Sequence, residues 1–282
     1  MEQTIRNKMN TMGIPLKQWN LKINRGILTG FNEAFIITEE KKDELIAADP
    51  KSAEIIRPIL RGKDIKRYQY SFANLWLIFV PWHFPLQNDN SITGSNKEAE
   101  KQFAYSYPAV YNHLLAYKPQ LSKRNKAETG IRYEWYALQR WGAKYWNDFS
   151  MQKIVWGNLC LSSQFALADE DYYINAPSTM IAPGNKYVLA VLNSRLGDWY
   201  IRRLGVTRNG GYFEYKPMFV EQLPIPMLSE NEQTKFITLV DRILAAKKRS
   251  EDTSELEEEI NKQIYQLFGL KKEEIIYIEK DE

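Results

Sequence analysis

The chain has 282 residues, with 38 Lys or Arg against 35 Asp or Glu and a formal net charge of +3. This length suits one large domain, or one domain with a small appendage, and a composition of 44% hydrophobic and 26% charged residues excludes a disordered or fibrous chain. The single cysteine, Cys160, excludes an internal disulfide, and one cysteine with two histidines cannot form an ordinary structural zinc site.

The N-terminal third is predicted to alternate short helices with strands, because apolar residues recur first at helical and then at alternating spacing. Thr38 is a typical N-cap, and Asp49-Pro50 is a typical stop. The expected elements are an amphipathic helix through Ile5, Met9 and Met12, two strands within residues 19–37, helices at 39–48 and 52–56, and a buried strand at 74–81.

The middle of the chain is predicted to form a β-rich body, because short apolar runs recur at even spacing between turn signals. Residues 118–132 are basic and lack periodicity, so they are expected to form an exposed loop. The other expected elements are a helix over 96–117 broken before Pro108, strands at 135–138, 153–159, 164–168, 172–174 and 178–181, and a helix over 186–204.

The C-terminal part begins with a glycine-rich loop at residues 205–218 and a proline-interrupted segment at 223–226 that cannot be a central strand. Ser229 opens a capping box before one helix, and a second helix ends at Gly269. We expect these helices to form an antiparallel pair. The predicted fold class is α+β, with a lead-in at 1–18, a recognition body at 19–228 and a helical appendage at 229–282.

The charge is divided unevenly along this layout. Residues 251–282 contain eleven acidic residues and four lysines, a net charge of −7, which leaves +10 on residues 1–250. Basic charge mixed with 37 aromatic residues (8 Trp, 17 Tyr and 12 Phe) favours a nucleic-acid partner, although an ordinary enzyme surface could look similar. No run of 18 apolar residues and no signal peptide is present, so the sequence predicts a cytoplasmic protein without a membrane span.

Catalytic motifs are scarce. The sequence has no Gly-x-Gly-x-x-Gly, no Walker-type phosphate loop and no Asn-Pro-Pro-Tyr segment, which base methyltransferases use on the target amine. A nuclease site needs clustered carboxylates and a lysine around Mg²⁺, and Asp198, Glu214 and Lys216 fit this pattern loosely. A Mg²⁺-dependent nuclease therefore remains an alternative. The two histidines and Cys160 are expected to have packing or surface roles.

Positive charge concentrates in three segments, at residues 51–70, 118–144 and 195–216. Two of them contain loops in which Asn, Gln or Tyr stands beside the charges. Lys and Arg neutralise phosphates, whereas Arg, Asn and Gln form paired hydrogen bonds with guanine and adenine edges. This mixture favours DNA binding over the plainer interpretation of three solvated loops.

Six short stretches occur in an order that carries further information. They are Gly26–Ile37, Ile56–Tyr68, Lys153–Val155, Tyr187–Ser194, Glu221–Pro226 followed by Glu232-Gln233, and Ile264–Leu270. In this order they resemble the C-terminal target-recognition domain of adenine-specific DNA methyltransferases of the TaqI type and of Type IIG restriction–modification enzymes. They also resemble, more distantly, the specificity subunits of Type I systems.

The resemblance implies a module that recognises double-stranded DNA and positions it for an N-terminal methyltransferase domain or subunit. The chain would then be a fragment or a stand-alone specificity module, and not an enzyme by itself. It implies no cofactor in this chain, whereas the parent enzyme would bind S-adenosylmethionine, with Mg²⁺ if it also cleaves DNA, and would flip an adenine out of the duplex. A third interpretation is a protein-interaction module that uses the terminal helices, to be tested by truncation after Leu228.

The candidate DNA contacts fall into the three basic segments. Phosphate anchors are expected in the first, base or stacking contacts at the end of the second, and a mixture in the third, where Gly210-Gly211 permits close approach. Neutralising a phosphate anchor should weaken binding on every sequence, whereas changing Arg208 should relax preference at one base pair. The candidates are Arg61, Lys63, Lys66 and Arg67; Lys123, Arg124, Lys126, Arg132, Tyr136, Gln139 and Arg140; and Arg208, Asn209, Tyr212 and Lys216.

Overall fold

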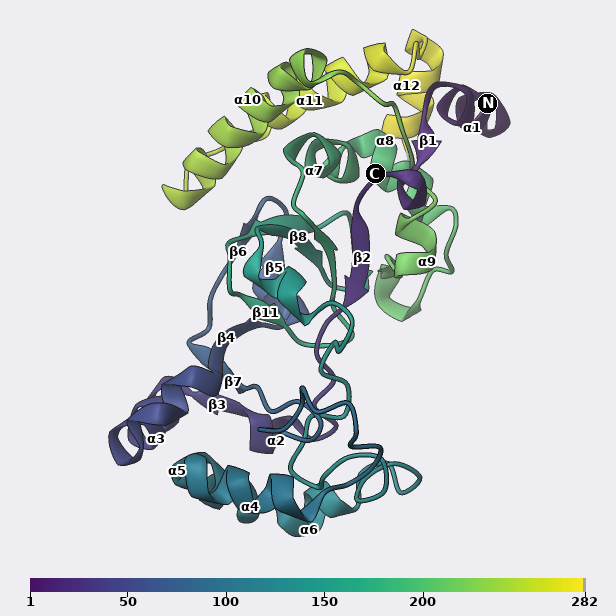
Figure 1. The fold of residues 1–282 in the computed structure, drawn as a ribbon. Coiled ribbons are helices and arrows are strands. Elements are labelled where there is room, and N and C mark those ends of the chain that lie inside the picture. The colour runs from purple at the N-terminus through teal and green to yellow at the C-terminus, as the bar shows by residue number, and fades with distance from the viewer. Residues whose placement is uncertain (281–282) are drawn as a thin grey trace.

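Two four-stranded sheets form the centre of the computed structural model, which describes residues 1–280 (Figure 1). The first sheet is antiparallel throughout, and the second contains one parallel pair, β11 with β4. In spatial order the first sheet is β10 (Phe165–Ala168), β8 (Lys153–Trp156), β12 (Thr179–Ala182) and β2 (Lys22–Arg25), and the second is β11 (Tyr173–Ile174), β4 (Ile56–Leu60), β7 (Leu75–Ile78) and β3 (Ile36–Thr38).

Three two-stranded pairs complete the β-structure. They are β1 (Ile14–Pro15) with β14 (Pro224–Ile225), β5 (Ile65–Lys66) with β6 (Gln69–Tyr70), and β9 (Leu159–Cys160) with β13 (Phe213–Glu214). The proline-interrupted segment thus pairs with one strand only, as its prolines require. The α+β fold class is confirmed, although helices occupy more of the chain than strands do, so the body is less β-rich than expected.

One hydrophobic cluster joins both ends of the chain to the first sheet. It contains α1 (Glu2–Met12), α7 (Lys186–Asn193), α8 (Arg195–Arg202), α10 (Glu230–Lys248), α11 (Ser254–Leu267) and α12 (Lys272–Glu279). Figure 1 shows α1 beside α12, where Lys8 Nζ donates to Gly269 O at 2.8 Å and contacts Glu274 Oε2 at 2.7 Å. The predicted lead-in and appendage therefore share one core, and truncation after Leu228 would remove part of it.

The capping box and the two long C-terminal helices are confirmed. Ser229 Oγ accepts from the Glu232 amide, and α11 runs back along α10 (Figure 1). The sequence did not predict α12, and Asp281 and Glu282 of the predicted appendage lie outside the described residues. On the N-terminal helix Ile5 and Met9 are buried as expected, whereas Met12 is half exposed.

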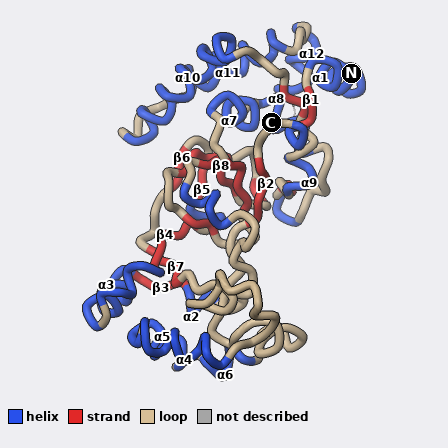
Figure 2. The backbone as a smooth tube through the Cα atoms, in the orientation of Figure 1, coloured by secondary structure: helices blue, strands red, loops and turns tan. Residues whose placement is uncertain are grey.

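A second hydrophobic cluster lies beneath the other sheet, with α2 (Asn32–Phe35), α3 (Glu39–Ala48), α4 (Lys97–Ser106), α5 (Pro108–Leu115) and α6 (Lys118–Ser122) around it. Figure 2 shows that much of the chain between these helices and the sheets is loop. The helix break before Pro108 and the Thr38 cap are confirmed. No helix within residues 1–280 is both long and apolar enough to cross a membrane.

Several predicted elements differ from the structure. The segment 135–138 forms turns around the buried aromatic cluster of Phe84, Phe103 and Tyr136, because its apolar side chains pack without a strand partner. Other differences are a helix at Asn32–Phe35 inside the predicted strand region, a 3₁₀ turn at Pro50–Ile55 in place of a helix at 52–56, a helix at Lys118–Ser122 inside the predicted loop, an early end at Trp156 of the strand predicted at 153–159, and a break at Ser194 that divides 186–204 into two helices.

Lys153 on β8 carries a positive charge in the core. Its side chain is fully buried, and its Nζ donates to the Asp169 carbonyl at 2.9 Å. Burial lowers the pKa of Lys153 to about 8, while the nearby acidic residues 169–171 oppose that shift. Since an exposed lysine titrates at about 10.4, the unfolded chain binds a proton between these two pH values that the folded chain does not.

We expect Lys153→Met to be more stable than the wild type at pH 7 by about 1–2 kcal/mol. The buried charge costs roughly 3 kcal/mol below pH 8, and loss of its hydrogen bond offsets about 1 kcal/mol of the gain. The wild type should regain roughly 3 kcal/mol as the pH rises from about 8 to 10, so the difference in stability should shrink and then change sign. Urea unfolding of both proteins across this range measures it, and a pH-independent difference would contradict the assignment.

Candidate nucleic-acid interface

Two of the three basic segments line one cleft of about 900 Å³. The first segment contributes Arg61, Lys63 and Lys66, and the third contributes Arg208, Tyr212 and Lys216. The turn after β8, the segment after β11 and Asn32 supply the remaining walls. Residues nearly 150 positions apart in the sequence therefore meet on one surface.

The Arg61–Asp64 turn builds the first wall. The Arg61 amide and Nε donate to Asp64 Oδ2 at 2.8 and 2.9 Å, and Nη2 donates to Oδ1 at 2.7 Å. Burial alone would raise the pKa of Asp64, but the Arg61 hydrogen bonds hold it below its usual value. The guanidinium of Arg61 is thus held by a carboxylate, which weakens its case as a free phosphate anchor.

Lys63 and Lys66 have their charges available. Both are exposed, and neither forms a hydrogen bond or an ion pair with any residue from 1 to 280. Gly62, directly before Lys63, packs against Ser178 and Gly157, since a Cβ there would lie 3.2 Å from Ser178 Oγ and 3.6 Å from Gly157 Cα. The glycine therefore lies in the lining of the cleft, and the two lysines are its exposed, unpaired cations.

The opposite wall is the loop that leads into β13. Gly210 and Gly211 both have φ near +80°, a conformation that glycine adopts without strain, and the Arg208 amide donates to Tyr212 O at 2.7 Å. Asn209 and Tyr212 are exposed on this loop. The glycine-rich loop predicted at residues 205–218 thus contains a turn at the two glycines.

Glu214 neutralises the cations on the same wall. It is buried, and it accepts Arg208 Nε at 2.6 Å and Lys216 Nζ at 3.0 Å. Hydrogen bonds from Lys216 and then Arg208 lower the pKa of Glu214. Arg208 Nη2 also contacts the same carboxylate, so two of its three nitrogens are occupied. The base contact predicted for Arg208 would require this ion pair to rearrange.

Arg67 is directed away from the cleft. Its Nε donates to Glu257 Oε2 on α11 at 2.5 Å, so the acidic C-terminal helices neutralise it. This ion pair links residues 190 positions apart, which no local pattern predicts. This ion pair weakens the case for Arg67 as a phosphate anchor beside Lys66, which stays a prediction.

The second basic segment does not line the cleft. Arg124 donates to the carbonyls of Thr29, Trp135 and Ala137 at 2.6–2.7 Å, and burial lowers its pKa to about 10. Tyr136 has no exposed surface, and its hydroxyl donates to Phe84 O at 2.9 Å. These contacts and the burial of Tyr136 do not favour the DNA contacts predicted for Arg124 and Tyr136, because both side chains hold the loop together.

The other candidates of this segment lie nearer the surface. Arg132 Nη1 donates to Glu128 Oε1 at 3.0 Å, and Arg140 Nη2 donates to Glu128 Oε2 at 2.8 Å. Gln139 is half-buried. Lys123 and Lys126 are exposed and have no ion pair within the described chain. Their contacts with DNA stay predictions, as does that of Asn209.

The residues of the nuclease alternative have separate partners. Asp198 accepts the Ser163 amide at 2.7 Å and the Tyr215 hydroxyl, and it faces Arg202 at 3.4 Å. Glu214 is bound by Arg208 and Lys216 instead. In residues 1–280 no three Asp, Glu, His or Cys side chains gather as a metal site would require. The geometry therefore gives this alternative no support.

The two histidines and the one cysteine have surroundings that fit packing roles. His83 Nδ1 contacts Glu134 Oε1 at 3.0 Å, and His113 Nε2 lies 2.9 Å from the Ala34 carbonyl. Cys160 is buried on β9, and burial raises the pKa of its thiol to about 11. The thiolate required of a nucleophile is thus disfavoured at neutral pH.

The sequence interpretation missed the turn after β8. This segment was expected to continue as a strand to Leu159, but it turns at Gly157 and presents amide and leucine side chains to the cleft. Its only sequence signal is an Asn, two leucines and a Gln between two apolar strands. The missed lining residues are Asn32, Asn158, Leu159, Leu161, Gln164 and Asn175.

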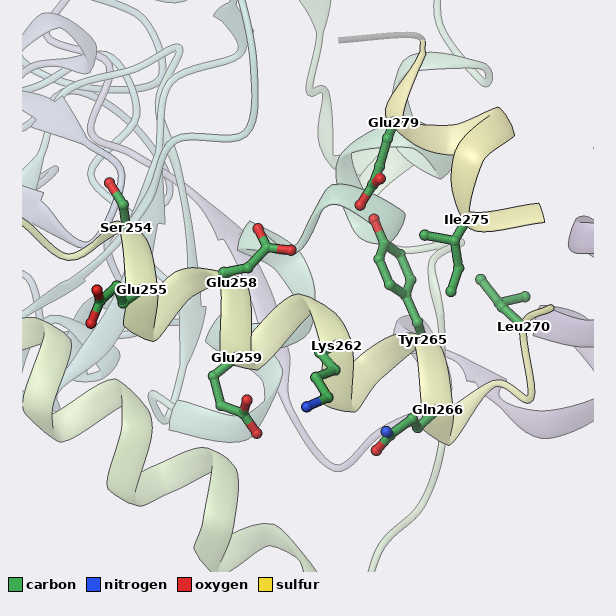
Figure 3. A pocket seen from close by; sticks show the side chains of 10 residues that line it. All are labelled: Ser254, Glu255, Glu258, Glu259, Lys262, Tyr265, Gln266, Leu270, Ile275 and Glu279. Atoms are coloured by element: carbon green, nitrogen blue, oxygen red, sulfur yellow. The ribbon is translucent and has the colours of Figure 1, made fainter. Parts of the chain in front are cut away.

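A hollow of about 720 Å³ between α11 and α12 has the opposite character (Figure 3). Its apolar side chains are Tyr265, Leu270 and Ile275. Four glutamates and one lysine surround them: Glu255, Glu258, Glu259, Glu279 and Lys262. Such an acidic surface repels phosphate, so these helices are poorly suited to contact the DNA backbone.

Comparisons with known proteins agree with the resemblance. The family model described as the TaqI-like C-terminal specificity domain matches residues 57–225. The Type II methyltransferase M.MjaIV of Methanocaldococcus jannaschii is 24% identical over 247 residues, which cover 85% of this chain and 76% of that protein.

One solved structure is similar in fold, and a second has a lower TM-score. The Type IIL restriction–modification enzyme MmeI, in complex with DNA, has a TM-score of 0.64 at 14% identity, covering 92% of this chain and 34% of that one. The Type IIG restriction endonuclease BpuSI has a TM-score of 0.49 at 12% identity, covering 95% and 32%. The chain thus spans about a third of the length of these two enzymes.

Proposed function

Because the chain belongs to the family of TaqI-like C-terminal specificity domains, we propose that it selects the double-stranded DNA site on which a restriction–modification enzyme acts. The observation that carries this proposal is the cleft shared by the first and third basic segments. It places the unpaired charges of Lys63 and Lys66 beside a floor of amide side chains. Lysines at the edge suit phosphates, and amides inside suit base edges.

The chemistry would belong to a partner. We propose an N-terminal methyltransferase domain or subunit that methylates adenine N6, with S-adenosylmethionine as its cofactor and Mg²⁺ if the parent also cleaves DNA. The M.MjaIV relative, which is named as a methyltransferase, supports this proposal. The role of this chain would be to position the duplex, since base-modifying enzymes must first extrude their target base.

The test is equilibrium binding of the 282-residue chain to a pool of random duplexes, and fluorescence anisotropy measures the binding. We expect weak binding whose log K falls linearly with log salt, by about 0.9 per phosphate contacted. An unchanged affinity between 50 and 200 mM salt, or no binding to any duplex, would contradict the proposal.

A plasmid assay with Mg²⁺ separates this proposal from the nuclease alternative. We expect intact plasmid, because Asp198 and Glu214 do not share a site. Cleavage that disappears in Glu214→Ala, while the variant unfolds like the wild type, would favour the nuclease instead.

A further inference from the structure

Besides Lys63 and Lys66, the free polar groups that line the cleft include side-chain amides. Gln164 and Asn175 both line it, and within residues 1–280 neither side chain has a hydrogen-bond partner. Asn158 uses its Oδ1 to accept from Thr179 Oγ1 at 3.1 Å, which leaves its amide nitrogen available. An Asn or Gln amide is the side-chain group that pairs with both N6 and N7 of adenine in the major groove.

The arginines of the cleft are differently placed. Arginine is the commonest reader of guanine because it donates two parallel hydrogen bonds to O6 and N7. The Asp64 carboxylate occupies two nitrogens of Arg61, and the Glu214 carboxylate occupies two of Arg208. Each guanidinium group is therefore bound within the chain, and reading guanine would require breaking an ion pair.

Two leucines stand beside the amides. Leu159 and Leu161 are 54% and 53% exposed, whereas Cys160 between them is 8% exposed, so the chain alternates and both leucines face outward. β9 and β13 form a two-stranded pair here, with Leu159 opposite Glu214. A two-stranded ribbon fits the major groove, where the thymine C5-methyl group is the apolar feature a leucine can contact.

We propose that the turn at residues 157–164, together with Asn175, reads the major-groove edge of A·T pairs. The amides of Gln164 and Asn175 bind adenine N6 and N7, and Leu159 and Leu161 contact the thymine methyl of such pairs. This inference rests on the DNA-recognition function proposed above and adds the class of base pair that this cleft prefers.

The test starts with the wild-type chain. Duplexes enriched from a random pool should contain at least one A·T pair at an invariant position. Replacing that adenine by 7-deazaadenine removes the N7 acceptor, and replacing its thymine by deoxyuridine removes the methyl. We expect the first change to weaken binding by roughly 5- to 150-fold, and the second to weaken it less.

Protein variants assign the contacts. Gln164→Ala and Asn175→Ala should each lose the sensitivity to 7-deazaadenine at one position, and Leu159→Ala with Leu161→Ala should lose the sensitivity to deoxyuridine. Gln152→Ala, which removes an exposed glutamine outside the cleft, is the matched control and should bind like the wild type.

Three outcomes would overturn the inference. Enriched sites that hold only G·C pairs, or invariant A·T pairs insensitive to both analogues, would do so while the DNA-recognition function stands. If the wild-type chain binds no duplex at all, both the DNA-recognition function and the A·T preference are contradicted. If a variant fails to fold, the analogue measurements on the wild type still decide.

Discussion

Replacing Lys63 and Lys66 together by glutamine should weaken duplex binding by roughly 10- to 100-fold at 0.1 M salt, to the same extent on every sequence. Both side chains are exposed at the edge of the cleft and carry charges that no residue from 1 to 280 pairs. Each lysine that leaves a phosphate removes about 0.9 from the salt slope, so the double variant should lose almost two units. Fluorescence anisotropy between 50 and 300 mM salt measures both effects.

The matched control is Lys97→Gln with Lys101→Gln, which removes the same charge from the exposed surface of α4 outside the cleft. This control should keep its salt slope within experimental error. Arg67→Gln should keep it too, because Arg67 is paired with Glu257. A slope unchanged in the Lys63/Lys66 variant, or reduced equally in the control, would show that the cleft does not hold the phosphates.

The local elements could be predicted from the sequence because their causes are local. The Thr38 cap, the break at Pro108 and the Ser229 capping box each depend on residues within one helical turn. The strand predicted at segment 135–138 was wrong because its burial does not have a local cause. Its apolar residues matched a strand pattern, but their burial comes from aromatic partners far away in the sequence.

In the candidate site, too, some features could be predicted from the sequence and others depend on tertiary contacts. Counting charges located three segments that could meet DNA, and two of these three share the cleft. The count could not assign partners, since Arg67 is ion-paired with Glu257 on α11 and Arg124 donates its hydrogen bonds to backbone carbonyls. Only tertiary structure decides which cations are free, and among the cations that line the cleft it leaves Lys63 and Lys66 without a partner in residues 1–280.

The missed turn at residues 157–164 has a related explanation. Neutral amides and leucines give no charge signal, so a search for basic patches passes over them. Their position becomes informative only when β9 pairs with β13 and carries the turn to the cleft. The basic part of an interface can thus be located from composition more readily than the part that reads bases.

Asp198→Ala should lower the free energy of unfolding by about 2–4 kcal/mol, because Asp198 organises a buried polar network. Its carboxylate accepts the Ser163 amide and the Tyr215 hydroxyl and faces Arg202, and the residue is 8% exposed. Burial, and then the Asp198 charge, raise the pKa of Tyr215, so the hydroxyl stays a donor at neutral pH. Removing the carboxylate leaves the donors of all three partners without this acceptor.

Urea unfolding at pH 7 measures the loss, and two variants show its origin. Asp198→Asn keeps one acceptor oxygen and should lose less stability than Asp198→Ala. Asp241→Ala removes an exposed carboxylate with one ion pair to Lys186, and such pairs contribute at most about 1 kcal/mol. Wild-type stability in Asp198→Ala, combined with loss of a Mg²⁺-dependent cleavage, would instead make Asp198 a catalytic carboxylate. Because a structural carboxylate and a metal ligand predict opposite pairs of results, this comparison decides between the recognition module and the nuclease.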